Sequence, residues 1–503
     1  MRTGILDYLE ESAARVPKKA AITDENESLT YEETVALSKK IGTALSGMTS
    51  EGSAVAVFAE KSARTLCTFF GSVYAGCFYT LFNPELPQSR LLDMQEVVKA
   101  KVVVAGEGLL EKAQLMFPQS RVVSMEELCL CAADEQRLLT IRRHHIDTDP
   151  LYLNFTSGST GVPKGILVGH RSVLDFIDCF TELFSITESD VIANQAPFDF
   201  DVSVKDIYSA VKTGAELVLI PRRLFSAPVE LVDFLCDHKA TTLIWAVSAL
   251  CLLSTFHGLD YKTPQTVNKV LFSGEVMPYK HLKNWRTHLP QAMFVNLYGP
   301  TEITCNCTYH ILDPNREYDE GIPIGQAFPN EDVFLLSQEG QKITDPDAVG
   351  EICVRGTALA LGYFENPSQT ELHFVQNPLQ GAYPERIYKT GDLGRISENG
   401  DFVFCGRVDF QIKYMGHRIE LEEVERAMAA IAGVERACCV FEEEKSKLYG
   451  FFVGSVEKDE LHRVMKETLP VFMVPGALRK VEAMPLTKNG KIDRKLLMEM
   501  KKR

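Results

Sequence analysis

Short apolar runs alternate with segments of helical period through most of the chain, which predicts an α/β fold with largely buried strands. The runs stand at 101–106 (KVVVAG), 216–220 (ELVLI), 242–247 (TLIWAV) and 269–274 (KVLFSG). Each is too short for an ordinary helix, and each is rich in Val, Ile or Leu, as strands covered on both faces are. We therefore expect a large N-terminal domain of mixed α/β layers.

Beyond Gly321 the expected strands follow one another more closely. They stand at 333–337 (VFLLS), 351–356 (EICVRG) and 401–406 (DFVFCG), with turn residues between them. This spacing predicts a more antiparallel, barrel-like portion of the large domain.

A further change of pattern begins at Ile419. Apolar residues then recur at helical spacing, and Gly433 stands where such a helix would end; the apolar positions are Leu421, Val424, Met428 and Ile431. A small domain of helices and strands follows. We expect a boundary near residues 407–409, with one domain over 1–406 and a second over 407–503.

Length and composition agree with a globular protein of at least two domains. The chain has 503 residues, of which 45% are hydrophobic and 24% charged. It has no apolar run of about 18 residues and no secretory signal, so we expect no membrane span and a cytoplasmic location. The net charge of -15 argues against nucleic acid as a partner. As a separate expectation, we expect a monomer.

The cysteines predict neither a disulfide framework nor a strong metal site. Thirteen cysteines are sparse for this length, and Cys305 and Cys307 are separated by one residue only. Free, mostly buried thiols are the favoured interpretation, and a metal site is the less favoured one.

The segment TSGSTGVPKG at 156–165 has the composition of a phosphate-binding loop. It holds four hydroxyl residues, three glycines and Lys164 within ten positions, directly after an apolar stretch. Glycines let backbone N–H groups approach phosphate oxygens, while the hydroxyls and the lysine add donors and positive charge. A flexible surface turn is the alternative. A Walker P-loop would need Gly at Pro163 and Ser or Thr at Gly165, so we do not expect an ordinary P-loop nucleotide hydrolase.

Further segments accompany this loop in a fixed order: LTYEE (29–33), YAGCFYTLFNP (74–84), NLYGPTE (296–302), VGEICVRG (349–356), ALGYF (360–364), YKTGDL (388–393), GRVDFQIKYMGHRIELEEVE (406–425), LPVFMVP (469–475) and NGKIDR (489–494). Over essentially its whole length the chain thereby resembles the adenylate-forming superfamily of acyl-CoA synthetases, luciferases and nonribosomal peptide adenylation domains. It is most similar to the amino-acid-activating branch, which includes the D-alanine:D-alanyl carrier protein ligases. The resemblance implies a small mobile α+β domain at the C-terminus.

The resemblance implies sites for ATP and Mg²⁺. Lys491 would supply positive charge to the reacting phosphate, and Glu302 would reach Mg²⁺; a solvated lysine and a helix cap are the alternatives. Asp392 would accept hydrogen bonds from the ribose hydroxyls, and Asp409 would be the hinge between the two arrangements of the small domain. Contacts to ATP would come from Thr156, Ser157, Gly158, Ser159, Thr160, Gly161, Lys164, Asn296, Tyr298, Gly299, Thr301, Asp392 and Arg407.

The resemblance also implies an amino-acid site. Asp201, rather than Asp199, matches the aspartate that pairs with the substrate's α-amino group, which would reject a plain fatty acid. The side-chain pocket would be lined by Val202, Lys205, Trp245 (or a neighbour one position away), Leu271, Ser273, Leu297, Cys305 and Asn306.

Lys205 and Ser273 depart from the pattern of the D-alanine ligases, where these positions are typically apolar and Cys. Lys205 either extends its ammonium to solvent or faces an acidic or polar substrate side chain. We narrowly favour alanine or serine as the substrate, and an acidic one if Lys205 points inward.

The leading hypothesis is an ATP-dependent amino acid:carrier protein ligase acting on a separate carrier protein with a phosphopantetheine arm. Only nine residues follow Arg494, so we expect no fused carrier domain. An acyl-CoA synthetase of the same fold is the first alternative, and a non-catalytic nucleotide-binding protein is the second.

Overall fold

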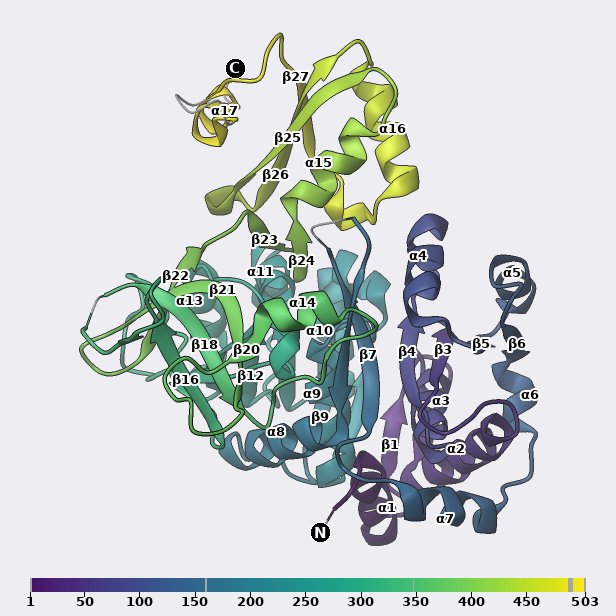
Figure 1. Cartoon of the computed structure of the whole chain (residues 1–503). Coiled ribbons are helices and arrows are strands. Elements are labelled where there is room, and N and C mark those ends of the chain that lie inside the picture. The colour runs from purple at the N-terminus through teal and green to yellow at the C-terminus, as the bar shows by residue number, and fades with distance from the viewer. Residues whose placement is uncertain (1, 159–160, 347, 487–491, 502–503) are drawn as a thin grey trace. The chain divides into compact units, whose positions relative to one another are not determined.

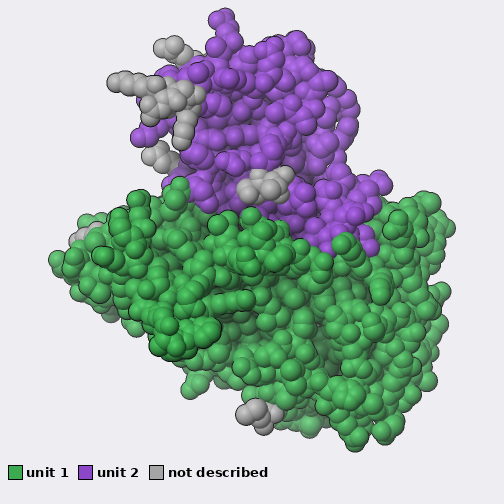
Figure 2. All heavy atoms as spheres, in the orientation of Figure 1, with its two compact units in different colours: residues 1–82, 98–154, 166–408 green, residues 83–97, 155–165, 409–503 purple. Residues whose placement is uncertain are grey.

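The structure is a computed structural model that describes residues 2–158, 161–346, 348–486 and 492–501 (Figure 1). The chain forms two compact units (Figure 2). Unit 1 comprises residues 1–82, 98–154 and 166–408, and unit 2 comprises residues 83–97, 155–165 and 409–503. The predicted α/β fold class is confirmed, since both units combine helices with sheets.

A nine-stranded sheet is the largest element of unit 1. Its order is β15 (Gln326–Ala327), β14 (Thr308–Ile311), β13 (Met293–Tyr298), β12 (Lys269–Ser273), β11 (Thr242–Ala246), β9 (Val191–Asn194), β10 (Glu216–Leu219), β1 (Ala20–Thr23) and β2 (Ser28–Thr30). The strands from β13 to β1 are parallel, and β14, β15 and β2 add antiparallel edges. Three of the predicted apolar runs form β10, β11 and β12.

Both faces of this sheet are buried, which explains why its strands are apolar at successive positions. On β11, Ile244 belongs to one hydrophobic core and Trp245 to the other. The Ile244 core includes α8 (His170–Leu183) and α9 (Val202–Thr213). The Trp245 core includes α10 (Pro228–Asp237), α11 (Val247–Thr255), α12 (Gly258–Tyr261) and α13 (Tyr279–His288).

A seven-stranded sheet contributes to the same core as α8 and α9. Its order is β19 (Gly362–Tyr363), β8 (Lys164–Gly169), β7 (Pro150–Thr156), β4 (Phe78–Phe82), β3 (Ala54–Phe58), β5 (Val102–Ala105) and β6 (Arg121–Ser124). The remaining N-terminal helices of unit 1 are α1 (Ile5–Arg15), α2 (Tyr31–Ser46), α3 (Ala63–Tyr74), α5 (Leu110–Met116), α6 (Met125–Cys129) and α7 (Glu135–His144).

Helix α9 is buried along most of its length. Every residue from Val202 to Val211 is buried, including the charged Lys205 and Asp206. The helix ends at Gly214, whose φ of 80° is the left-handed conformation that glycine adopts readily at a helix C-terminus. A helix this deep in the core places its polar residues where only protein or ligand can satisfy them.

A six-stranded antiparallel sheet completes unit 1 and confirms the antiparallel portion predicted beyond Gly321. It runs β17 (Lys342–Ile343), β16 (Glu331–Leu336), β18 (Gly350–Gly356), β21 (Arg386–Ile396) and β20 (Phe374–Gln376), with β22 (Phe402–Arg407) also on β21. Helix α14 (Pro367–His373) leads into β20.

Unit 2 has a three-stranded sheet, β25 (Val434–Glu442), β26 (Lys447–Gly454) and β27 (Ala477–Lys480), and a hairpin of β23 (Gln411–Tyr414) and β24 (His417–Glu420). Its helices are α15 (Leu421–Ala429), α16 (Lys458–Thr468), α17 (Arg494–Met500) and α4 (Gln88–Val98). Helix α15 ends at Ala429, earlier than the predicted Gly433. Gly433, with φ of 87°, instead forms the turn into β25, where a Cβ would lie 3.1 Å from the Val456 nitrogen.

Candidate active site

A buried lysine lies at the carboxyl end of the nine-stranded sheet. The Lys205 side chain on α9 is fully buried, and its Nζ donates to Ser273 Oγ at 3.1 Å and to Asn306 Oδ1 at 2.8 Å. Ser273 is the last residue of β12, and Asn306 follows β13 by eight positions. The alternative in which this lysine extends to solvent is therefore wrong.

A strained turn positions Asn306. Thr304 and Cys305 have φ of 52° and 75°, and the Asn306 nitrogen donates to the Thr304 carbonyl at 3.0 Å, which closes a γ-turn. The Cys305 thiol donates to the Asp201 carbonyl at 3.2 Å. Gly299 makes this approach possible, because a Cβ there would lie 2.5 Å from the Asn306 Cα. Strain of this kind in a buried loop is typical of functional sites.

Asp201 is brought to the same place. It precedes the first turn of α9, its side chain makes no capping bond to the helix, and the residue is 7% exposed. Burial lowers the pKa of Lys205, and Cys305, Asp201 and Asp206 oppose that shift. The site thus combines a buried carboxylate, a buried ammonium and neutral polar groups, which suits a small zwitterionic ligand.

The other residues expected around the side-chain pocket divide between two faces of the sheet. Val202, Leu271 and Leu297 are buried, and the two leucines lie in the same core as α9. Trp245 lies in the opposite core, where its Nε1 donates to the Ala193 carbonyl at 2.8 Å. The structure therefore does not bring Trp245 together with Lys205, because strand alternation turns it away. Ala246, one position later, is the residue that pairs with Ser273.

A buried polar network beside this cluster was not predicted. Asp206 accepts from Asn194 Nδ2 at 2.7 Å, and Lys61 donates to Asn194 Oδ1 at 3.2 Å. Burial raises the pKa of Asp206, and burial lowers the pKa of Lys61 to about 8. Asp206 Oδ1 has no hydrogen-bond partner within the described parts of the chain. No motif connects these three residues in the sequence, so only the fold could have revealed the network.

The residues expected to bind ribose lie together in unit 1. Asp392 on β21 is opposite Arg407 on β22 in the strand register, and the two side chains form an ion pair. The Tyr298 hydroxyl donates to the other Asp392 oxygen at 2.6 Å. This arrangement fixes a carboxylate with two acceptor oxygens, which is the chemistry that a diol requires.

Glu302 follows Tyr298 by four positions in the sequence. It is 1% exposed, and one of its oxygens accepts from the Tyr363 hydroxyl at 2.7 Å. Thr301 begins the 3-10 turn that carries Glu302, and Asn296 on β13 donates to the Pro323 carbonyl at 2.9 Å. Among the described residues, no group of three or more His, Cys, Asp or Glu side chains is placed to hold a metal ion.

The glycine-rich loop belongs to unit 2. Thr156 ends β7, Lys164 begins β8, and Gly161 has φ of 88°. Gly158 packs tightly, since a Cβ there would lie 2.1 Å from the Val162 carbonyl oxygen. The Ser157 hydroxyl donates to the Arg418 carbonyl at 2.7 Å.

Three of the predicted residues fall outside the described part of the chain: Ser159, Thr160 and Lys491. Asp409, the expected hinge, begins the long C-terminal segment of unit 2, and its carboxylate accepts from the Gln411 nitrogen at 3.2 Å.

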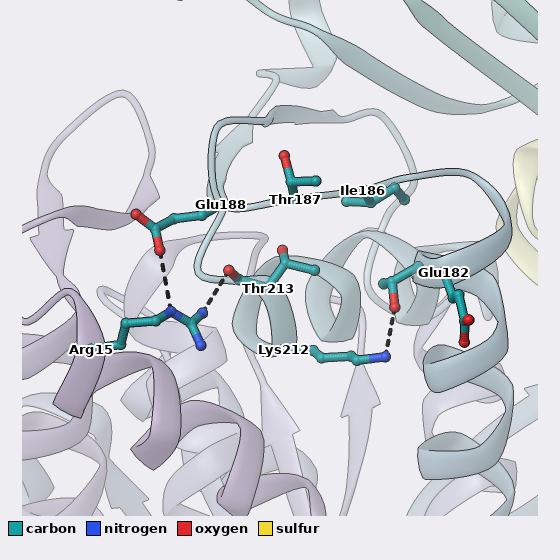
Figure 3. A pocket seen from close by; sticks show the side chains of 8 residues that line it. Arg15, Glu182, Ile186, Thr187, Glu188, Lys212 and Thr213 are labelled. Atoms are coloured by element: carbon teal, nitrogen blue, oxygen red, sulfur yellow. Dashed lines mark hydrogen bonds and ion pairs between the residues drawn. The ribbon is translucent and has the colours of Figure 1, made fainter.

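Figure 3 shows a surface pocket of about 380 Å³ lined in part by Lys212 and Thr213. These two residues end α9, whereas Asp201 precedes its first turn. Both of its cations are paired. Arg15 donates to Glu188 at 3.2 Å and to the Thr213 carbonyl at 2.6 Å, and Lys212 donates to Thr181 Oγ1 at 2.7 Å and forms an ion pair with Asp178 at 2.6 Å. This shallow pocket is a structural junction of α1, α8 and α9 rather than a second candidate site. Nowhere in the described ranges does a helix combine the length and apolar character needed to cross a membrane.

Residues 9–364 match the family described as AMP-binding enzyme, and residues 423–491 match the AMP-binding enzyme C-terminal domain. The chain is 31% identical to zwittermicin A synthase ZmaJ of Bacillus cereus, over 99% of this chain and 95% of that protein. It is also 31% identical to surfactin synthase subunit 1 of Bacillus subtilis, over 98% of this chain but only 14% of that protein. A solved structure of holo-PA1221, a nonribosomal peptide synthetase protein containing adenylation and peptidyl carrier domains, matches with a TM-score of 0.85 and 25% identity, over 99% of this chain and 84% of that one.

Proposed function

Since this chain belongs to the AMP-binding enzyme family and is an adenylate-forming ligase, we propose that it activates an amino acid and transfers it to a carrier protein thiol. The observation that carries this proposal is the buried Asp201 carboxylate at the start of α9. A carboxylate there suits a substrate ammonium, whereas a fatty acid has no positive charge with which to interact with it.

The reaction would proceed in two steps. First, a substrate carboxylate oxygen bonds to the α-phosphorus of ATP as the bond to the bridging oxygen breaks, and pyrophosphate leaves. Second, the phosphopantetheine sulfur of a separate carrier protein attacks the acyl carbon, its proton passes to solvent, and AMP leaves. Lys491 would offset anionic repulsion in the first step, and Asp392 would hold the ribose.

Glu302 fits a role in holding Mg²⁺. This ion is usually bound through one or two protein carboxylates together with substrate phosphates, so a single buried carboxylate agrees with the donor set it prefers. The hydrogen bond from Tyr363 orients that carboxylate. Magnesium would neutralise phosphate charge when bound.

The inward position of Lys205 favours a substrate with an acidic side chain. Its side chain is fully buried, and its ammonium donates hydrogen bonds to two neutral oxygens, Ser273 Oγ and Asn306 Oδ1. A substrate carboxylate would add a direct ion pair to these two neutral hydrogen bonds. We therefore propose aspartate or glutamate as the preferred substrate class.

A small amino acid is the second candidate, because Ser273 and Asn306 already hold the ammonium and fill part of the space beside it. D-alanine belongs to this candidate, through the resemblance to the D-alanine ligases. The two candidates differ in whether Lys205 contacts the substrate.

A substrate panel read by amino-acid-dependent pyrophosphate exchange tests the proposal. The panel comprises both enantiomers of alanine, serine, aspartate and glutamate, with cysteine and several fatty acids. We expect exchange with amino acids only. Robust exchange with a fatty acid and none with any amino acid would instead indicate an acyl-CoA synthetase.

The variant Lys205→Met separates the two substrate classes. If the substrate is acidic, the variant loses it by about 100-fold or more in kcat/KM, since a buried carboxylate is left unpaired. If the substrate is alanine or serine, activation stays within about threefold of the parent, because methionine fills similar volume. Lys212→Met, at the far end of the same helix, is the matched control and should leave the substrate preference unchanged.

A further inference from the structure

The glycine-rich loop of unit 2 is already engaged by a carboxylate. The Gly158 nitrogen donates to Glu423 Oε2 at 3.1 Å, and Arg90 on α4 donates to Glu423 Oε1 at 2.7 Å. Glu423 lies in the first turn of α15 and is 4% exposed, and the Arg90 side chain is 12% exposed. The three groups therefore form a buried chain from α4 through α15 to the loop.

A second contact holds the adjacent position of the loop. The Ser157 hydroxyl donates to the Arg418 carbonyl at 2.7 Å and accepts from the Glu420 nitrogen at 3.3 Å. A hydroxyl and a backbone amide of the loop are thus both used by residues 418–423. These are donors of the kind that a glycine-rich loop offers to phosphate oxygens.

Carboxylate and phosphate oxygens are interchangeable acceptors for such donors, and one N–H cannot serve both at full strength. Burial raises the pKa of Glu423, and Arg90 and the Gly158 amide oppose that shift. Glu422, its neighbour on α15, is exposed. The carboxylate that faces the loop is therefore the one that the fold buries and pairs.

We propose that Glu423, held by Arg90, is a latch that competes with the phosphates of ATP for the Gly158 amide. The proposal rests on the proposed two-step function and adds a regulation of its nucleotide site. The loop would release Glu423 when triphosphate binds and take it back when pyrophosphate leaves. The latched state then favours the thiol-transfer step, in which the loop holds no triphosphate.

The test measures binding of α,β-methylene-ATP by calorimetry, without amino acid, so that no reaction can follow. Glu423→Gln keeps the size of the side chain and removes its charge. We expect it to bind the analogue about fivefold more tightly than the parent, since a charge-assisted hydrogen bond to the loop no longer has to be displaced. Glu422→Gln, with the same change of charge on the same helix, should bind as the parent does. Equal affinity of Glu423→Gln and the parent would overturn the latch.

Arg90→Gln distinguishes the latch from an effect of local charge alone on the affinity for ATP. It also provides a second test of the latch if Glu423→Gln fails to fold. Removing a positive charge should weaken the binding of a polyanion if only the local field matters. The latch makes the opposite prediction, tighter binding, because Glu423 without Arg90 leaves the loop more readily. Weaker or unchanged binding in Arg90→Gln would overturn the proposal.

The transfer step supplies a second readout. Thioester formation from preformed aminoacyl-AMP should slow by about fivefold in Glu423→Gln and remain at the parent rate in Glu422→Gln. An unchanged rate in Glu423→Gln would contradict the part of the proposal that concerns transfer. Failure of the proposed function is distinguishable, because the parent would then show no amino-acid-dependent pyrophosphate exchange while the binding test still applies.

Discussion

At the residue scale, the site depends on placing charge where water does not reach. Lys205 and Asp206 are adjacent on α9, and both are fully buried. Each is held by neutral amides or hydroxyls: Lys205 by Ser273 and Asn306, Asp206 by Asn194. Such groups lower the cost of burying a charge. Burial raises the pKa of Asp206 to about 8 and lowers the pKa of Lys205, and each of the two groups opposes the shift of the other.

Lys491 provides a prediction at this scale. We expect Lys491→Ala to lower aminoacyl-AMP formation by about 100-fold or more, because the variant lacks the lysine charge that would offset the negative charge of the reacting phosphate. Thiol transfer from preformed aminoacyl-AMP should remain largely intact. The measurement is single-turnover kinetics of each half-reaction, with Lys495→Ala as a control in the same basic segment. Equal losses in both half-reactions would show that Lys491 has another role.

At the element scale, two histidines connect the start of α1 to the start of α8. The Ile5 nitrogen donates to His170 Nδ1 at 3.2 Å, and the His145 ring stands edge-on to His170 with centroids 4.4 Å apart. Burial lowers the pKa of both histidines; Asp149 and Asp7 oppose this for His145, while Arg142 reinforces it for both. The contact is therefore built for neutral imidazoles.

This contact predicts that stability falls with acidification. Because the pKa of each histidine in the folded protein lies below the unfolded value of about 6.5, their contribution to the free energy of unfolding is fully present above that pH. It is lost as the pH falls, by up to about 1.4 kcal/mol per pH unit for each histidine. His170→Asn keeps an acceptor for Ile5 but does not titrate. We expect a shallower decline of Tm between pH 7 and pH 5 than in the parent.

The exposed His144 gives the matched control, and His144→Asn should decline as steeply as the parent. If His170→Asn also declines as steeply as the parent, His170 does not contribute to the acid sensitivity.

Several elements could be predicted from the sequence because their signals are local. Continuous apolar runs such as 242–247 predicted strands, and the structure confirms them. The face on which Trp245 lies could not be predicted, since a shift of one residue on a strand reverses the face. The network of Lys61, Asn194 and Asp206 joins positions far apart in the chain, so no local pattern marks it.

At the scale of the whole molecule, the chain does not divide at a single point. Unit 2 takes residues 83–97 and 155–165 as well as 409–503. The sequence predicted one boundary near 407–409, because sequence patterns show where consecutive segments differ and not which distant segments pack together. The division of labour between the predicted domains 1–406 and 407–503 remains a prediction.

The hinge can be tested with one substitution. Asp409→Pro fixes φ at this position and restricts Val408, so we expect it to block thiol transfer while adenylation survives. Asp409→Ala, which leaves the backbone free, should transfer at close to the parent rate. Both half-reactions are measured separately, and unimpaired overall turnover in Asp409→Pro would place the hinge elsewhere.

The position of β1 in the nine-stranded sheet has a consequence for biosynthesis. Ile22 on β1 pairs in parallel with Leu217 on β10, so the strand gains its parallel neighbour only after nearly 200 further residues have been made. At about 5–20 residues per second, the ribosome needs about 10–40 s to deliver them. The first strand to leave the exit tunnel thus waits for its parallel neighbour while β2 to β9 are made, and in that interval the edge that will pair with β10 is open to chaperones.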